Sequence, residues 1–237
     1  MDGNYSIIKN IKISYCETMN GGNIMKKQTI FLFILCALSF IGHLFVLPLL
    51  PEEVPIHWNA YGEVDNWGSK LSTLFLALLP ALMLVLFLVV PRIDPRGKNY
   101  EKHQKAYQVF ITMMILFLTA LLWVTNAAAL GYPVPIGRLV PIGCGIILIT
   151  VGNYMPQLRN NYTMGIKNPW TLESEWVWKK THAMGGIVFC IMGFVMVLNG
   201  FFSTDWMAKL SLGVILLGVF GLETYSYVLY RKWKANI

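Results

Sequence analysis

Two polar stretches of this chain carry most of the side chains that could bind a ligand or do chemistry. The first, EVPIHWNAYGEVDNWGSK at residues 53–70, lies between two long apolar runs. Its His57, Asn59 and Asp65 could in principle ligate a metal ion. One imidazole with one amide and one carboxylate is a sparse set for zinc, and the spacing matches no zinc pattern. A hydrogen-bonded turn that fixes the loop is therefore favoured over a metal site, with direct contact to a ligand as a third alternative.

The second polar stretch, GNYMPQLRNNYTMGIKNPWTLESEWVWKKTH, covers residues 152–182. Pro169 followed by Thr171 is typical of a helix start, and Glu175 with Lys179 is a favourable i,i+4 ion pair. These residues predict a short amphipathic helix that leads into the next apolar run. The tryptophans expected at the level of the lipid headgroups are Trp170, Trp176 and Trp178. A membrane-interface anchor is favoured over a partner-binding surface.

The chain offers little else for catalysis. It contains no HExxH, no GxSxG and no paired intramembrane aspartates. An enzyme would have to use His57 or His182 as a general base. The sequence therefore predicts no catalytic residue, no cofactor and no metal ion, and it disfavours the enzyme class.

Composition places the chain in a membrane. Of its 237 residues, 56% are hydrophobic and only 13% are charged, which is too apolar for a water-facing surface. Six runs are long enough to cross a hydrocarbon core of about 30 Å. They cover residues 29–50, 71–91, 107–130, 137–155, 184–202 and 207–230. The expected fold is all-α, a polytopic membrane bundle of six transmembrane helices.

The distribution of positive charge indicates the orientation. The net charge is +7, and 19 residues are Lys or Arg. All except Lys70, Arg138 and Lys209 precede the first run, lie in the second or fourth connection, or close the chain. Because cytoplasmic connections of membrane proteins are enriched in Lys and Arg, both termini are expected in the cytoplasm. Membrane topology thus explains the excess of positive charge, and no direct contact with nucleic acid is expected.

The spans divide the chain into four segments. Residues 1–27 are expected to form a cytoplasmic tail, with Met1 or Met25 as the start of the protein. The other segments are a two-span module with the first polar stretch (28–91), a cytoplasmic loop with a bridging third span (92–136), and a module of the last three spans with the second polar stretch (137–237).

Four of the polar side chains inside the spans are candidates for a functional role. Glu223 lies about 10 Å from the inner end of its helix, where an ionised group costs on the order of 2 kcal/mol or more. It is expected to be neutral and hydrogen-bonded to Asn153 or Tyr227, with a proton or ligand relay as the functional alternative. The other three share the outer third of their spans and are expected to make interhelical hydrogen bonds rather than one polar layer: His43, Asn126 and Asn199.

Glycines predict where the helices approach one another. Gly186, Gly193 and Gly200 recur every seven residues on the fifth span. The neighbouring spans also carry glycines, namely Gly143, Gly145, Gly152, Gly213 and Gly218. Because small residues let helices pack closely in lipid, the last three spans are expected to form one tightly packed unit.

Together, the two polar stretches resemble the signatures of the SdpI family of bacterial membrane immunity proteins, including its N-terminal DUF1648-type domain. The stretch LPEEVPIHWNAYGEVDNWGSK is similar to the family's N-terminal motif, which ends in Trp-Gly-Ser-Lys. The second stretch is similar to its C-terminal signature, with Gly-Asn, Gly-Ile, Pro-Trp-Thr-Leu and Trp-x-x-Thr-His. The sequence departs from the family pattern at Lys167 and Asn168, where members often have Arg and Thr.

The resemblance assigns functional residues to both stretches by motif position. The outer element consists of His57, Asn59, Gly62, Asp65, Trp67, Gly68, Ser69 and Lys70. The inner element consists of Gly152, Asn153, Asn160, Gly165, Pro169, Trp170, Thr171, Trp178, Thr181 and His182.

The resemblance also implies a function. It indicates a multi-pass protein of the bacterial plasma membrane that protects its cell against a secreted antimicrobial peptide toxin met on the outer side. In the family's best-understood case the protein also recruits an ArsR-type winged-helix autorepressor to the membrane. Toxin engagement is expected to shift the glycine-striped helices and change the exposure of the inner stretch. Two rivals remain: a small-solute or ion transporter that uses Glu223, and a membrane-embedded enzyme that acts on toxin or envelope.

Overall fold

The computed structural model describes residues 26–59 and 62–237 and contains six helices long and apolar enough to cross a membrane. The N-terminal helix and the short η1 turn (Leu47–Leu49) make the first, Lys26–Leu49. The other long helices are α2 (Ser72–Ile93), α3 (Gln104–Ala129), α4 (Ile136–Tyr154), α6 (Glu175–Phe202) and α7 (Asp205–Lys234). Short pieces are η2 (Gly97–His103), η3 (Met155–Gln157) and α5 (Pro169–Glu173). The predicted helical membrane bundle is confirmed.

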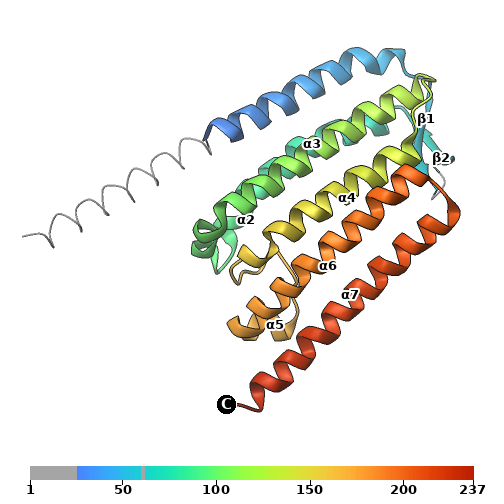
Figure 1. Cartoon of the computed structure of the whole chain (residues 1–237). Helices are drawn as coiled ribbons and strands as arrows, with labels where there is room; N and C mark the ends of the chain where they lie inside the picture. The colour runs from blue at the N-terminus through green and yellow to red at the C-terminus, as the bar shows by residue number, and fades with distance from the viewer. Residues whose placement is uncertain (1–25, 60–61) are drawn as a thin grey trace, which may run out of the picture.

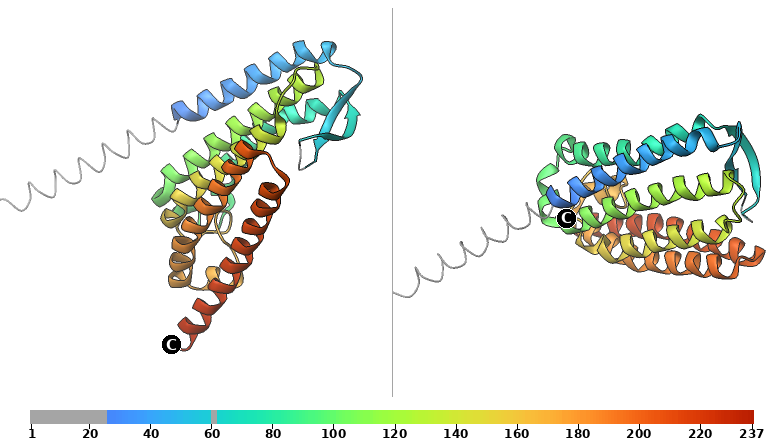
Figure 2. Two further views of the ribbon diagram at one scale, coloured as in Figure 1. Left: turned by 45° about the vertical axis from the view of Figure 1, so that its right-hand side comes forward. Right: turned by 90° about the horizontal axis from the view of Figure 1, so that it is seen from above.

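The helices follow an arc rather than a closed ring. α2 packs against α3, α3 against α4, α4 against α6, and α6 against α7. The N-terminal helix lies beside α3, to which Ser39 is joined by a hydrogen bond from the indole N–H of Trp123 (3.0 Å). Both ends of the described chain lie at the end of the bundle away from the two strands (Figure 1). Figure 2 shows the N-terminal helix and α7 on opposite margins of the arc.

Glycines bring α4 and α6 into backbone contact. A Cβ atom placed on Gly145 would lie 2.5 Å from the carbonyl oxygen of Gly193, and one placed on Gly152 would lie 2.7 Å from that of Gly186. The expected close packing is therefore confirmed for this pair of helices. On α7 the prediction is confirmed for Gly218, where a Cβ would lie 2.8 Å from the Met192 sulfur and 2.9 Å from the Val188 side chain of α6, but not for Gly213, where a Cβ would meet nothing within 4 Å.

A β-hairpin stands at one end of the bundle, where the sequence predicted only a hydrogen-bonded loop. β1 (Glu53–Trp58) and β2 (Val64–Ser69) pair antiparallel, with register shifts on either side of His57. Gly62 adopts the positive φ of 80° that the tight turn needs. An isolated two-stranded ribbon is marginal in water. This one is held by the bundle, because β1 packs on α3 and Val54 is completely buried.

Candidate functional site

His57 and Asp65 form a close polar pair on the hairpin. The His57 Nδ1 atom lies 2.5 Å from Asp65 Oδ1, and the two side chains are 66% and 43% exposed. Asn59 does not join them, because its side chain is bonded to Glu63 at 3.0 Å. The three residues weighed as metal ligands are thus not assembled into one site. Within residues 26–59 and 62–237, no group of three or more His, Cys, Asp or Glu residues could hold a metal ion.

The base of the hairpin is fixed to the membrane helices. Lys70 Nζ makes an ion pair with Glu52 at 2.8 Å, and the Lys70 backbone N–H donates to the Glu52 carbonyl at 2.9 Å. The Ser69 hydroxyl accepts the backbone N–H of Leu71 beside the start of α2. Gly68 lies in the strand, where a Cβ would be 3.0 Å from Ile56, and Trp67 is exposed. These four predicted residues therefore hold the hairpin in place and present one indole to the surroundings.

Behind the hairpin lies a cavity of about 710 Å³. His57, Asn59 and Gly62 line its hairpin side, and Asn199 lines its wall on α6. The sequence contains no signal for this cavity, because its lining residues come from the hairpin and five helices. Three residues of the predicted outer element thus line one side of the cavity.

His43 links three helices within the membrane. Its Nδ1 atom lies 3.0 Å from the Asn126 amide nitrogen on α3, and its Nε2 atom lies 3.1 Å from the Thr73 hydroxyl on α2. The expected interhelical hydrogen bond is confirmed for His43 and Asn126. Asn199 lines the cavity on α6, and no hydrogen bond joins it to His43 or Asn126 among the described residues.

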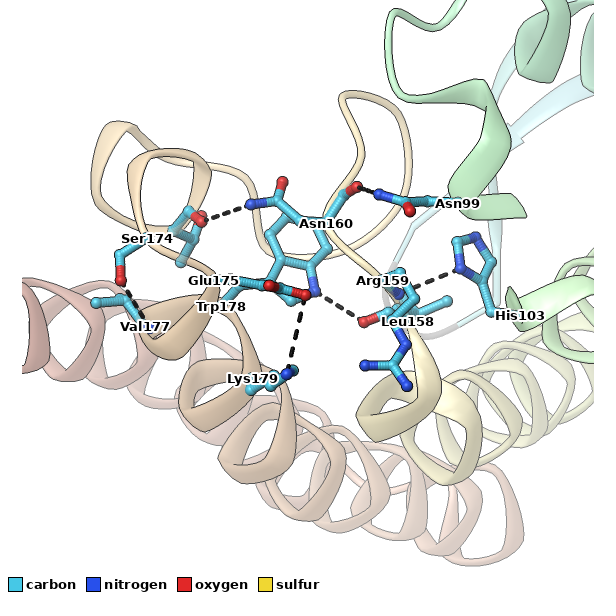
Figure 3. A network of polar contacts seen from close by, with 11 residues as sticks. Asn99, His103, Leu158, Arg159, Asn160, Ser174, Glu175, Val177, Trp178 and Lys179 are labelled. Carbon is cyan, nitrogen blue, oxygen red and sulfur yellow. Dashed lines mark hydrogen bonds and ion pairs between the residues drawn. The ribbon is translucent and has the colours of Figure 1, made fainter. Parts of the chain in front are cut away.

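The second polar stretch folds with the connection after α2 into one compact cap, defined here as residues 94–103 and 155–174. The cap folds over Trp178 and His182 of α6. Their rings stack with centroids 3.9 Å apart, and both side chains are fully buried. The Trp178 indole N–H donates to the Leu158 carbonyl at 2.8 Å (Figure 3). His182 Nε2 accepts the Ile166 N–H at 3.1 Å, while its Nδ1 donates to the Trp178 carbonyl at 2.9 Å.

Gly165 lies against this stacked pair. Its φ is +103°, and a Cβ there would lie 2.2 Å from His182 Nε2, so only glycine lets the chain pass over the imidazole. The expectation that Trp178 anchors at the membrane interface is wrong, because the loop folds over it and its indole is satisfied internally. Trp176 is exposed as expected.

The predicted short helix that starts at Pro169 is confirmed, but it ends before Glu175 and Lys179, which belong to α6. Asn168 caps α5, accepting the Thr171 N–H at 2.9 Å, while the Thr171 hydroxyl accepts the Asn168 N–H at 3.1 Å. α5 ends at Glu173, and Ser174 then caps α6 through the N–H of Val177. Glu175 and Lys179 form the predicted ion pair at 3.8 Å (Figure 3).

The partner of Glu223 is neither of the two residues expected. Asn168 donates from its amide nitrogen to the Glu223 carboxylate at 2.9 Å and to the Ser226 hydroxyl at 2.8 Å. Asn153 is exposed on α4, where its side-chain oxygen lies 4.0 Å from the Cys190 sulfur, and the Tyr227 hydroxyl accepts from Arg231 instead. Trp170 packs edge-on against Tyr227, with ring centroids 5.3 Å apart. Asn168 therefore joins the cap to α7, although Glu223 lies 55 positions later in the sequence.

Asn160 ties the two parts of the cap together. Its side-chain oxygen accepts from the Arg96 guanidinium, which also donates to the Leu172 carbonyl at 3.3 Å. Its backbone carbonyl accepts from the Asn99 amide at 2.7 Å, beside a bond from the Arg159 N–H to His103 (Figure 3). Thr181 is also fully buried, and its hydroxyl has no hydrogen-bond partner among the described residues.

Asp94 is the residue of the cap that sequence reasoning missed. It directly follows α2, and its carboxylate accepts four hydrogen bonds of 2.8–3.0 Å. The donors are the backbone N–H groups of Arg96 and Tyr162 and the hydroxyls of Tyr100 and Thr163. Burial raises the pKa of Asp94, but these bonds outweigh it and leave the pKa below its ordinary value of 3.8. A lone aspartate between two prolines was its only sequence signal.

Comparison with known proteins identifies both halves of the chain. Residues 34–84 match a domain of unknown function, DUF1648, and residues 157–226 match the SdpI/YfhL protein family. The immunity protein SdpI of Bacillus subtilis (strain 168) is 31% identical over 212 residues, which is 90% of this chain and the whole of the relative. No solved structure matches. The first match includes the hairpin and the second includes most of the cap. The chain is therefore a multi-pass bacterial membrane protein that belongs to the SdpI family of immunity proteins.

Proposed function

We propose that this membrane protein protects its cell against a secreted antimicrobial peptide toxin, and that the toxin contacts the hairpin. The observation that carries this proposal is the exposed His57–Asp65 pair on a ribbon that the bundle holds rigidly in place. Charged and hydrogen-bonding groups that are fixed before binding lose little conformational entropy on contact with a peptide. The B. subtilis relative, which is named an immunity protein, supports the same function.

Substitution of the hairpin pair should weaken protection. Cells that carry His57→Ala or Asp65→Ala should be killed at a toxin concentration about ten-fold lower than cells with the parent protein, the factor for about 1.4 kcal/mol of lost binding. Killing assays with matched membrane expression measure this. Asn66→Ala, an exposed neighbour on β2, is the control and should protect fully. Equal protection by all three variants contradicts the assignment of the hairpin.

The proposal places the hairpin outside the cell and the cap in the cytoplasm. The distribution of Lys and Arg supports this orientation. A cysteine introduced at Asn66 should react with an impermeant thiol reagent in intact cells, whereas one at Lys167 should react only after the cells are opened. The reverse pattern of labelling rules out this orientation.

We propose in addition that the cap end recruits an ArsR-type repressor. Trp176 is exposed and lies beside the exposed Lys179 and Lys180, whereas Trp178 two residues later is fully buried. Exposed tryptophan is typical of binding hot spots. Trp176→Ala should remove a co-expressed repressor from the membrane fraction, as measured by sedimentation and immunoblotting. Trp206→Ala, an exposed tryptophan at the start of α7, should not. Equal sedimentation in both variants counts against this partner surface.

A further inference from the structure

The cavity behind the hairpin occupies the concave side of the helix arc. Its lining comes from the hairpin and from α2, α3, α4, α6 and α7. α2 packs on α3 and α7 packs on α6, but these two outer helices share no packing face with each other. Figure 2 shows α7 diverging from the hairpin and α2. The cavity thus lies where the arc is open sideways, toward the space that lipid fills in a membrane.

The bundle is closed at the end opposite the hairpin. There the cap bridges from Asp94 at the end of α2 to α7, through the Arg96–Leu172 bond and the Asn168–Glu223 bond. Trp170 packs on Tyr227 at the same level. A molecule in the cavity can therefore enter from the side or from the hairpin end, and the cap blocks passage at the opposite end.

The lining of the cavity suits a hydrocarbon chain. Its walls are mainly apolar, with Leu76, Leu121, Val140, Met196 and Ile215 contributed by five different helices. A volume of about 710 Å³ lies in the range of roughly 300–1,000 Å³ typical of sites for small amphiphilic ligands. Left empty, such a space would forfeit the dispersion contacts of its lining side chains.

One polar group in the lining lacks a partner. Ser211 on α7 is only 5% exposed, and its hydroxyl makes no hydrogen bond among the described residues. A buried hydroxyl without a partner is costly, so this group is suited to donate to an acceptor on a bound molecule. The Asn199 amide lines the same cavity nearer the hairpin end.

The depth of Ser211 suggests which acceptor it meets. α7 has 30 residues, so it is about 45 Å long and exceeds a hydrocarbon core of about 30 Å by roughly 15 Å. Ser211 lies six residues after Asp205, or about 9 Å along the helix. With the excess divided between both ends, this depth is close to the boundary where the ester carbonyls of glycerolipids lie.

We propose that the cavity binds one glycerolipid of the adjoining leaflet, with an acyl chain against the apolar walls and an ester carbonyl accepting the Ser211 hydroxyl. The polar headgroup would then face His57 and Asn59 at the hairpin side. A membrane lipid is favoured over a peptide because the cavity opens laterally into the bilayer, where lipid is the abundant molecule. This inference is independent of protection against a toxin.

Photo-crosslinking of the full chain in proteoliposomes tests this proposal. The probe is phosphatidylglycerol with a diazirine on one acyl chain, and adducts are located by peptide mass spectrometry. Adducts are expected on Val140 and Met196. Ala208→Phe, which fills the lining with a ring, should reduce them at least about five-fold. Leu217→Phe, on the exposed face of α7 at 76% exposure, is the matched control and should leave them unchanged.

A second variant separates lipid binding from misfolding. Ser211→Ala removes only the hydroxyl, and it should lower adduct yield about five-fold for the ester-linked probe but not for an ether-linked analogue without carbonyls. Adducts confined to exposed residues such as Leu217, or equal yields in parent and Ala208→Phe protein, overturn the proposal. If Ala208→Phe abolishes toxin protection while lipid adducts persist, the occupant is a peptide and the lipid assignment fails.

Discussion

Leucine in place of Gly193 should lower the free energy of unfolding by about 3 kcal/mol, the upper part of the range for overpacking a tight interface. A Cβ at Gly193 would already lie 2.5 Å from the Gly145 carbonyl oxygen and 2.8 Å from Ile149. Two of the three nearest atoms, the Gly145 carbonyl oxygen and the Ile149 backbone nitrogen, belong to the backbone of α4 and cannot rotate away as a flexible side chain can. Accommodation therefore requires the two helices to separate. Reversible unfolding in mixed detergent micelles measures the loss.

Gly213→Leu is the matched control for this change. It introduces the same side chain at a glycine of a neighbouring helix, where a Cβ would meet nothing within 4 Å. Its effect should stay within about 0.5 kcal/mol, as at other uncrowded surface positions. If the two variants unfold at the same detergent composition, α4 and α6 are not in the backbone contact described here.

Much of the fold could be predicted because lipid imposes strong rules on sequence. A membrane span must be a long apolar helix, so the six helices follow directly from the runs of residues in the chain. Close approach in lipid needs small side chains, so the spacing of Gly186, Gly193 and Gly200 indicated the face of α6 that meets α4. Likewise, Pro169 and Thr171 marked a helix start because helix capping is local in sequence.

The predictions that were wrong concern contacts between segments distant in sequence. Trp178 was predicted to be an interfacial anchor, but its indole N–H donates to the carbonyl of Leu158, twenty positions earlier. Glu223 accepts a hydrogen bond from Asn168 in a folded loop rather than from Asn153 on another helix. The strands were missed because two six-residue segments gain their stability from packing on the helices, β1 on α3 and β2 on α2, and not from their own sequence pattern. In each case the deciding partner lies in another element.

Asp94 holds together the two connections that form the cap. Its carboxylate accepts bonds from its own connection, through Arg96 and Tyr100, and from the distant loop, through Tyr162 and Thr163. Hydrogen bonds to a charged group contribute more than neutral ones, at about 1.5–3 kcal/mol each before compensation. Because only 8% of Asp94 is exposed, water cannot readily replace donors that lose their acceptor.

Asp94→Asn should therefore lower the free energy of unfolding by about 3 kcal/mol at pH 7, since an amide has one acceptor oxygen and turns its NH₂ group toward donors. The effect should depend on pH. The pKa of Asp94 is lowered in the folded protein, so its contribution is complete above the unfolded value of about 3.9 and declines as pH falls through that value toward the folded pKa. The stability difference between parent and variant should thus begin to shrink below about pH 4 and narrow further as the pH approaches the folded pKa, as detergent unfolding at several pH values would show. Asp205→Asn, at an exposed carboxylate, should unfold like the parent at pH 7. A constant difference between parent and Asp94→Asn across this range would mean that the carboxylate charge does not hold the cap.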